Sequence, residues 1–264
     1  MRRTTLAAVC LATAATVGLT ACGTDTGGSK KSEGKVTGAA KEGGREAKKE
    51  TGPFPGMSGP DIVDKAVKAT TDAKSLKVKG SVPDETGTIE LDMAFDTKGQ
   101  CAGTMGMGGE GSLDLITTAR TVYMKYDEEF LRAQGKGQPA AETEAAVDML
   151  AGRWVKTSAT GGDAKDIASF CDLDVLLAEF KDVNSAARRG KTTTVDGTPA
   201  LTLTESDGKD RYTLYVATEG KPYLLKVVNE TAKTPESLAF SEFDKPVNAQ
   251  PPAGDVMDID KLAG

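Results

Sequence analysis

The chain has 264 residues, with 33 lysines and arginines against 39 aspartates and glutamates, and a formal net charge of −6. It contains no histidine, which excludes Ser-His-Asp and Cys-His catalytic arrangements within this chain. From residue 61 onward there are 24 basic against 34 acidic residues, and such an acidic body argues against nucleic acid as a partner, because phosphate binding needs clustered cations.

Residues 1–21 have the layout of a secretory signal peptide. Arg2 and Arg3 precede an apolar run over residues 6–19, which is too short to span a bilayer, since a spanning helix needs about 20 apolar residues. Leu-Thr-Ala at positions 19–21 stands directly before Cys22 and resembles the lipobox of bacterial lipoproteins. The resemblance implies cleavage before Cys22, diacylation of its sulfur and anchoring on the outer face of the cytoplasmic membrane. The alternative is an ordinary secreted protein with a chance cysteine.

Residues 22–60 are predicted to be a lipidated flexible tether. This segment is rich in Gly, Lys, Glu and Ser and has almost no large apolar residue, so it cannot bury enough surface to order itself. Residues 61–264 then form the folded domain, which is long enough for one sizeable core.

A helix is expected over residues 61–73, because Pro60 and Asp61 suit a first helical turn and apolar residues recur at helical spacing after them. After residue 75 the apolar period changes from about four to two, most clearly over residues 89–96. Further strands are expected over residues 100–108, 113–117 and 121–126. Short Gly-containing turns predict an antiparallel meander, and glycines within the strands predict a strongly bent sheet.

A helical block interrupts the strands. One helix is expected over residues 139–151, and another after Asp172, whose apolar residues follow an i, i+3, i+4, i+7 stripe. A short extended piece over residues 152–156 lies between them and holds the single tryptophan, Trp154.

Two cysteines remain once Cys10 leaves with the signal peptide and Cys22 carries lipid. Cys101 and Cys171 can pair outside the cell, and a bridge would pin the second helix to the bent sheet. The alternative is two separate buried thiols.

Strands resume near residue 194 and continue over residues 200–205, 212–216, 223–229 and 237–243, separated by Asp-Gly and Gly-Lys turns. The predicted fold class is therefore α+β. We expect one curved antiparallel sheet, a half-barrel of roughly nine to eleven strands, with helices on its concave side.

The order of these elements resembles the actinobacterial LppX/LprG-type cell-envelope lipoproteins, relatives of the LolA-like carriers. The resemblance is carried by the lipobox, the tether, the helix before the strand at residues 75–80, residues 150–156, and residues 195–200 followed by 214–217. It covers the chain from residue 61 onward. It implies a half-barrel around an apolar cavity that binds acyl chains of envelope lipids or lipoglycans.

The candidate cavity lies between the sheet and the helices of residues 139–181. Its expected lining consists of apolar side chains from the inward face of the strands, the tryptophan and the helical stripe: Met93, Phe95, Met105, Met107, Met124, Trp154, Leu173, Leu176, Leu177, Phe180, Leu201, Leu203, Leu214 and Val216. Methionine suits such a pocket because its side chain is flexible and polarisable.

An ordinary packed core is the alternative for these residues, and a structural anchor between helix and sheet is the alternative for Trp154. A solid core would make the protein a surface module that binds a protein or a cell-wall polymer through its outer face. The sequence has no Walker loop, no Gly-x-Ser-x-Gly and no dinucleotide glycine pattern. It therefore predicts a protein that is not an enzyme and that holds no cofactor and no metal. A protein partner in the envelope is left unidentified.

Overall fold

The structure is a computed structural model that describes residues 52–84, 87–161, 164–178, 186–233 and 236–261. The chain divides into two units, residues 1–47 and 48–264, and every described residue belongs to the second. The predicted signal peptide, Cys22, nearly all of the tether and Phe180 lie outside the described residues.

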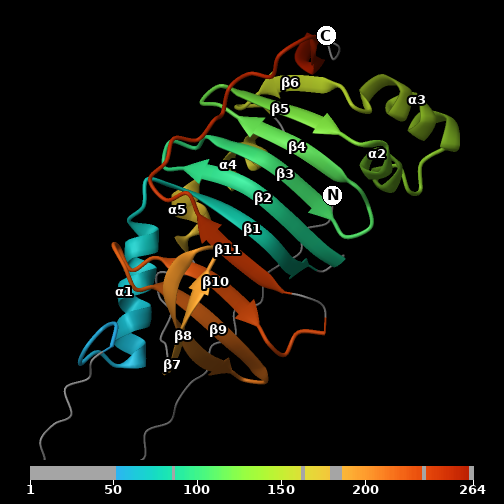
Figure 1. The fold of residues 1–264 in the computed structure, drawn as a ribbon. Coiled ribbons are helices and arrows are strands. Elements are labelled where there is room, and N and C mark those ends of the chain that lie inside the picture. Colours follow the sequence, from blue (N-terminus) through green and yellow to red (C-terminus); the bar gives the residue numbers. More distant parts are fainter. Residues whose placement is uncertain (1–51, 85–86, 162–163, 179–185, 234–235, 262–264) are drawn as a thin grey trace, which may run out of the picture. The chain divides into compact units, whose positions relative to one another are not determined.

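Twelve strands of the second unit form one curved sheet, with the strand order β12-β6-β5-β4-β3-β2-β1-β11-β10-β9-β8-β7 (Figure 1). The first part is a helix followed by an antiparallel meander: α1 (Gly59–Thr71), β1 (Ser75–Asp84), β2 (Gly87–Asp96), β3 (Cys101–Met107), β4 (Ser112–Thr117) and β5 (Thr121–Tyr126). Among its described residues, the middle part carries four α-helices and one strand: α2 (Glu128–Gln134), α3 (Ala140–Leu150), β6 (Trp154–Ser158), α4 (Ala164–Phe170) and α5 (Leu173–Leu176).

The last part of the chain adds five strands beyond β1, at the edge of the sheet opposite to β6. It consists of five antiparallel strands, a short strand and a turn of 3-10 helix: β7 (Arg188–Val195), β8 (Thr198–Asp207), β9 (Asp210–Ala217), β10 (Leu224–Asn229), β11 (Ser237–Ser241), β12 (Val256–Asp258) and η2 (Ile259–Lys261). β11 pairs with β1, which joins the two groups of strands, and β12 pairs with β6 in parallel. The predicted class, one curved sheet with helices on it, is confirmed, with one strand more than the upper end of the expected range.

α1 begins where its sequence provides a cap. The Ser58 hydroxyl accepts a hydrogen bond from the Asp61 N–H, and the Asp61 carboxylate accepts from the Ser58 N–H, so two otherwise unpaired backbone donors are satisfied. Pro60 stands in the first turn, where its missing N–H has no cost. The helix buries Ile62, Val63 and other small or apolar residues against the sheet.

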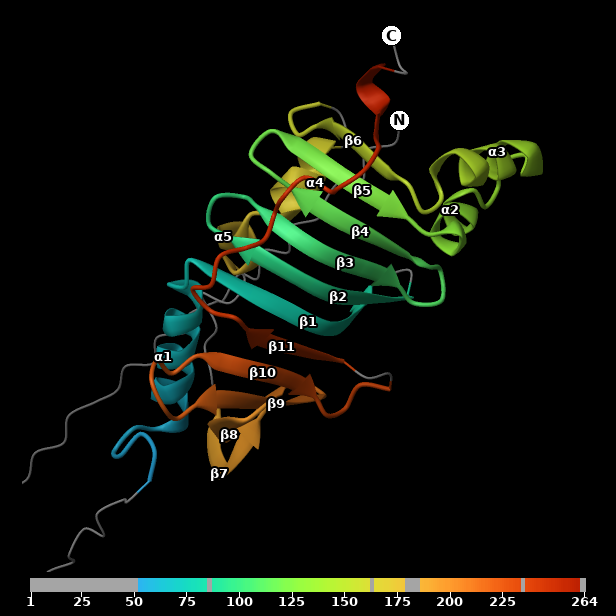
Figure 2. The ribbon, with the colours of Figure 1, turned by 45° about the horizontal axis from the view of Figure 1, so that its top comes forward.

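The larger of two core clusters lies on one face of the sheet, and strand residues alternate between that face and the other. On β2, Met93 and Phe95 are completely buried, whereas Asp92, the residue before Met93, reaches the surface. α4 and α5 pack on this core face, and the ring of Phe170 meets that of Phe95 edge to face at 5.8 Å between centroids. α2 and α3 instead lie beyond the ends of β4 and β5 (Figures 1 and 2). The predicted helix at residues 139–151 therefore exists, but it does not cover the core face of the sheet.

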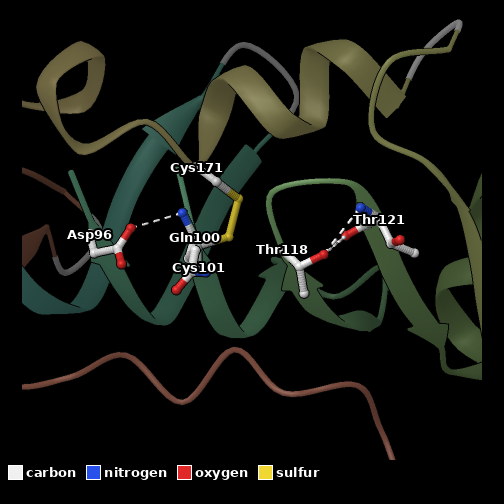
Figure 3. Close-up of a disulfide and its surroundings, with 6 residues drawn as sticks. All are labelled: Asp96, Gln100, Cys101, Thr118, Thr121 and Cys171. Carbon is white, nitrogen blue, oxygen red and sulfur yellow. Dashed lines mark hydrogen bonds between the residues drawn. A yellow bond between two sulfur atoms is a disulfide. The ribbon is translucent and has the colours of Figure 1, made fainter. Parts of the chain in front are cut away.

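The predicted disulfide is present. Cys101 opens β3 and Cys171 follows α4, both are fully buried, and their Cα atoms are 5.3 Å apart. Figure 3 shows the bond crossing from the helical layer to the sheet, beside the turn in which the Asp96 carboxylate accepts from the Gln100 N–H. The bond ties α4 to the sheet across 70 residues of sequence.

Candidate functional site

A hollow of about 470 Å³ lies between α1 and the core face of β8–β10. We call it the α1 hollow. It is lined by residues of α1, of the three strands and of the segment before β7: Val63, Val67, Ala186, Glu205, Ser206, Asp207, Tyr212, Leu214, Leu224 and Val227. Its volume falls within the range of about 300–1,000 Å³ that is usual for small-molecule sites.

The register of β8, β9 and β10 arranges the side chains on their core face in rows of decreasing depth. Leu201, Val216 and Leu224 form the deepest row and are at most 3% exposed, and of these Leu224 borders the hollow. The next row consists of Leu203, Leu214 and Val227. The outermost row is polar, with Glu205 opposite Tyr212 and Tyr212 opposite Asn229. A register shift between Leu224 and Lys226 adds one residue to β10, so Val227 shares a face with Leu224.

α1 covers these rows and is held at both ends. Near its C-terminus, the buried Thr70 hydroxyl accepts a hydrogen bond of 2.9 Å from the Leu224 N–H. At its N-terminus, Gly59 approaches β7 so closely that a Cβ would stand 1.9 Å from the Ala187 carbonyl oxygen. The Arg189 guanidinium donates to three carbonyl oxygens of the segment before the helix, those of Pro53, Phe54 and Met57.

Carboxylates surround the mouth of the α1 hollow. The pKa of Tyr212 is raised, first by burial and then by the negative charges of Asp210, Glu236 and Asp207. The Glu205 carboxylate accepts from the Ala186 N–H at 3.1 Å, and the Glu236 carboxylate accepts from the Asn229 side-chain amide at 2.8 Å. The hollow thus combines an apolar floor with an acidic mouth.

Most of the residues predicted to line a cavity pack together in one core cluster instead of bordering the α1 hollow. Met93, Phe95, Leu173, Leu203 and Val216 have no exposed surface at all. Other members of the cluster, or residues packed against it, are Met105, Met124, Leu176, Leu177 and Leu201. Of the predicted set, Leu214 lines the α1 hollow itself.

Two predicted residues lie elsewhere. Trp154 is on the other face of β6, because its neighbour Val155 is the buried one, and the Lys125 ammonium stands 5.2 Å from the centre of its ring. Met107 is partly exposed at the end of β3, where it borders a small recess with Gly87 and Glu110. Neither reaches the α1 hollow.

The α1 residues Val63 and Val67 are functional candidates that the sequence did not single out as lining residues. Each follows a residue of the apolar stripe Ile62, Ala66, Ala69 and Ala73 in the sequence. The helical spacing of that stripe indicated that one face of the helix is buried. What the spacing could not show is which strands that face covers.

A second, polar depression of about 400 Å³ lies over β1–β4, lined on the face opposite the core by Lys79, Glu90 and Thr104 among others. A cross-strand row of paired charges borders it. The Asp92 carboxylate lies 2.6 Å from the Lys77 ammonium and 2.9 Å from that of Lys79, and these contacts lower its pKa. In the part of the chain that the structure describes, no group of three or more acidic or cysteine side chains is placed to hold a metal ion. Among those same residues, no helix combines the length and apolar character needed to cross a membrane.

No protein-family model matches the chain, and no curated protein does. Solved structures similar to it include LprF from Mycobacterium bovis, at 16% identity over 74% of this chain and 97% of that one, with a TM-score of 0.49. The Mycobacterium tuberculosis lipoprotein LppX matches at 12% identity over 72% and 96%, with a TM-score of 0.43. A LolA superfamily protein from Nitrosomonas europaea matches at 10% identity over 74% and 96%, with a TM-score of 0.22. LppX and a LolA superfamily protein, both in the group that the sequence resembles, are thus among the solved structures similar to this chain.

Proposed function

We propose that the protein is a lipoprotein of the outer face of the cytoplasmic membrane whose body binds an acyl chain of an envelope lipid or lipoglycan in the α1 hollow. The observation that carries the proposal is the hollow itself, a space of about 470 Å³ whose apolar lining includes Val63, Val67, Leu214, Leu224 and Val227. A chain entering it would leave water for apolar surface, which is worth about 0.8 kcal/mol for each CH₂ group buried.

Anchoring through Cys22 would keep the body near its source of ligand. As a flexible coil, the 38 residues after Cys22 would span about 34 Å on average. Such a reach would keep the body near the lipid surface without fixing its orientation, which would suit a protein that takes up or delivers a membrane component.

A second candidate function is a surface module that binds a protein or a cell-wall polymer. It is favoured by the filled core between β1–β5 and the helices α4 and α5, where Met93, Phe95 and Leu173 leave no exposed surface. The polar depression over β1–β4 would then be the contact surface. Uptake of an apolar ligand separates the two functions.

The test is displacement of the uncharged fluorescent probe N-phenyl-1-naphthylamine by dodecanol, with the purified wild-type protein and two tryptophan variants. Val67→Trp places a large ring in the α1 hollow, whereas Lys65→Trp places the same ring on the exposed side of the same helix. We expect saturable displacement with wild type and Lys65→Trp, and at least about tenfold weaker binding with Val67→Trp, because the ring occupies the volume of the ligand.

Melting curves of both variants show that they are folded before binding is compared. Absence of probe and dodecanol binding in wild type would end the lipid-binding proposal in favour of the surface module. Equal binding by wild type and a folded Val67→Trp would remove the α1 hollow as the site.

A further inference from the structure

We propose that Leu224 closes the inner end of the α1 hollow, so that the hollow binds one unbranched hydrocarbon chain up to a length that Leu224 sets. The inference rests on the proposed function, since it concerns the same hollow. It adds the number of chains that bind, the direction in which a chain enters, and the residue that selects its length.

The core of the protein lies directly behind Leu224. Leu224 borders the hollow and is 2% exposed. Val216 of β9 lies opposite it, and Leu201 of β8 lies opposite Val216. These two residues, at 0% and 3% exposure, belong to the packed core cluster and not to the described lining of the hollow. A chain that reaches Leu224 therefore meets filled core and can go no deeper.

The position of Leu224 is fixed by a helix and by an irregularity of its own strand. The Thr70 hydroxyl of α1, a residue that is 3% exposed, accepts the hydrogen bond from the Leu224 N–H at 2.9 Å. The register shift between Leu224 and Lys226 then lets Leu224 and Val227 share the core face. Leu225, between the two, belongs to the smaller cluster on the opposite face.

The lining changes from apolar to polar in one direction. Leu224, Val227 and Leu214 line the part nearest the core, whereas Ser206 and Asp207 line the part at the end of β8. A polar head placed beside Leu224 would lose its hydrogen bonds to water without a replacement. The methyl end of a ligand therefore enters first, and its head stays at the end of β8.

The length of the hollow follows from the strand that forms its wall. On β9, Val216 stands opposite Leu224, and Tyr212 at the polar end is four residues away, which is about 14 Å at about 3.4 Å per residue. An extended hydrocarbon chain with C–C bonds of about 1.5 Å advances about 1.3 Å per carbon. About eleven carbons therefore span the hollow when the chain is straight.

The volume limits the hollow to one such chain. A space of about 470 Å³ holds about sixteen groups of about 30 Å³, the volume that one molecule takes in liquid water and close to that of a CH₂ group. Two chains of about eleven carbons need about twenty-two such groups. We therefore expect one chain that fills the hollow at about eleven carbons when straight and at about sixteen at most when bent.

The experiment uses a series of alkyl maltosides with chains from hexyl to hexadecyl, each below its micelle-forming concentration, as competitors of N-phenyl-1-naphthylamine. Their head is uncharged and constant, so affinity reports the chain alone. Each CH₂ group that enters the hollow should strengthen binding about fourfold, and each group beyond its capacity stays in water and adds nothing. For wild type we expect this rise to stop at a chain of about eleven to sixteen carbons.

The variants change the inner end of the hollow. Leu224→Ala opens room for about two or three more carbons, so the rise should stop at a chain longer by that amount, and the longest maltosides should bind about tenfold more tightly than to wild type. Leu224→Val removes less volume, carries less risk to folding, and should move the limit by about one carbon. Leu225→Ala is the matched control, because it makes the same change in the neighbouring residue on the opposite face and should keep the wild-type limit.

Melting curves select the folded variants, and the outcomes separate the two proposals. If no maltoside displaces the probe from wild type, the proposed function fails and the inference fails with it. If maltosides bind but affinity keeps rising about fourfold per CH₂ group through hexadecyl, the inference alone is wrong. A limit that stays in place in the folded Leu224 variants, or that moves equally in Leu225→Ala, also overturns it, because Leu224 would not be the end of the hollow.

Discussion

Gly103 of β3 occupies a position where the backbone of the neighbouring strand β2 leaves no room for a side chain. Its φ is +154°, and a Cβ built on it would stand 2.1 Å from the Asp92 carbonyl oxygen. Gly80 of β1 has the same φ and would meet the Ser237 carbonyl oxygen at 1.9 Å. These two glycines let neighbouring strands approach closely, whereas the sequence predicted only that glycines within the strands bend the sheet.

We expect Gly103→Ala to lower the free energy of unfolding by about 2–3 kcal/mol, because the new methyl group forces β2 and β3 apart. Gly106→Ala on the same strand is the control. Its Cβ would have no neighbour nearer than 3.4 Å, that of Glu90, so a change within about 0.5 kcal/mol is expected. Urea denaturation measures both, and equal losses in the two variants would contradict the close-approach explanation.

Asp244 joins three segments that are distant in sequence. Its carboxylate accepts from the Lys221 ammonium and the Tyr223 hydroxyl, each at 2.7 Å, and from the Lys74 N–H at 2.9 Å. These contacts, with that of Lys221 the largest, lower its pKa, and the same pairing raises the pKa of Lys221. The group lies after β11 and ties the start of the C-terminal segment to the β9–β10 turn.

We expect Asp244→Asn to cost about 1 kcal/mol at pH 7, a small value because the carboxylate is 36% exposed and screened by water. Since its pKa is lower in the folded state, its contribution is fully present above the unfolded value of about 3.9 and is lost as the pH falls below about 4. The difference between wild type and variant in thermal unfolding should therefore shrink between pH 5 and pH 2. A difference that stays constant over that range would show that the charge contributes nothing.

At the scale of elements, the disulfide holds α4 and the start of α5 against β3. A bridge that closes a loop of 70 residues lowers the conformational entropy of the unfolded chain. In this description it stabilises the folded state by about 4 kcal/mol. We expect reduction to lower the melting temperature markedly, because typical domains have only about 5–15 kcal/mol of total stability. Two reactive thiols per chain, found by labelling the unfolded and unreduced protein, would contradict the presence of the bond.

The sequence predicted the elements whose pattern is local. The alternation over residues 89–96 gave β2 and its buried face, and the stripe after Asp172 correctly placed Leu173 and Leu177 against the sheet. β7 was predicted only from residue 194, because the run Arg188–Val195 is polar on both faces and has no period to detect. β12 has three residues and exists as a strand through its pairing with β6.

The site was harder to predict than the fold for a physical reason. Alternation says which residues share a face, but the position of a helix over a sheet depends on tertiary packing. Thr70, Gly59 and Arg189 place α1 over β8–β10, and they make contacts with residues distant in sequence. The expected cavity beside α4 and α5 is occupied by side chains, and the space lies under α1 instead.

At the scale of the whole molecule, the proposed function depends on an anchor as well as a hollow. Cys22→Ala removes the sulfur that would carry lipid while leaving the body unchanged. We expect the variant to move from the membrane fraction to the soluble fraction once the signal peptide is removed. Retention of the processed variant in membranes to the wild-type extent would contradict lipid anchoring at Cys22.

Native mass spectrometry of the protein purified from its host tests the central claim most directly, because it detects a bound ligand without presuming its identity. We predict that wild type carries an added mass, beyond its covalent lipid, that corresponds to a single-chain or larger lipid, and that Val67→Trp carries much less of it. An unloaded wild type, or equal loading of wild type and the folded variant, would contradict a lipid-binding α1 hollow.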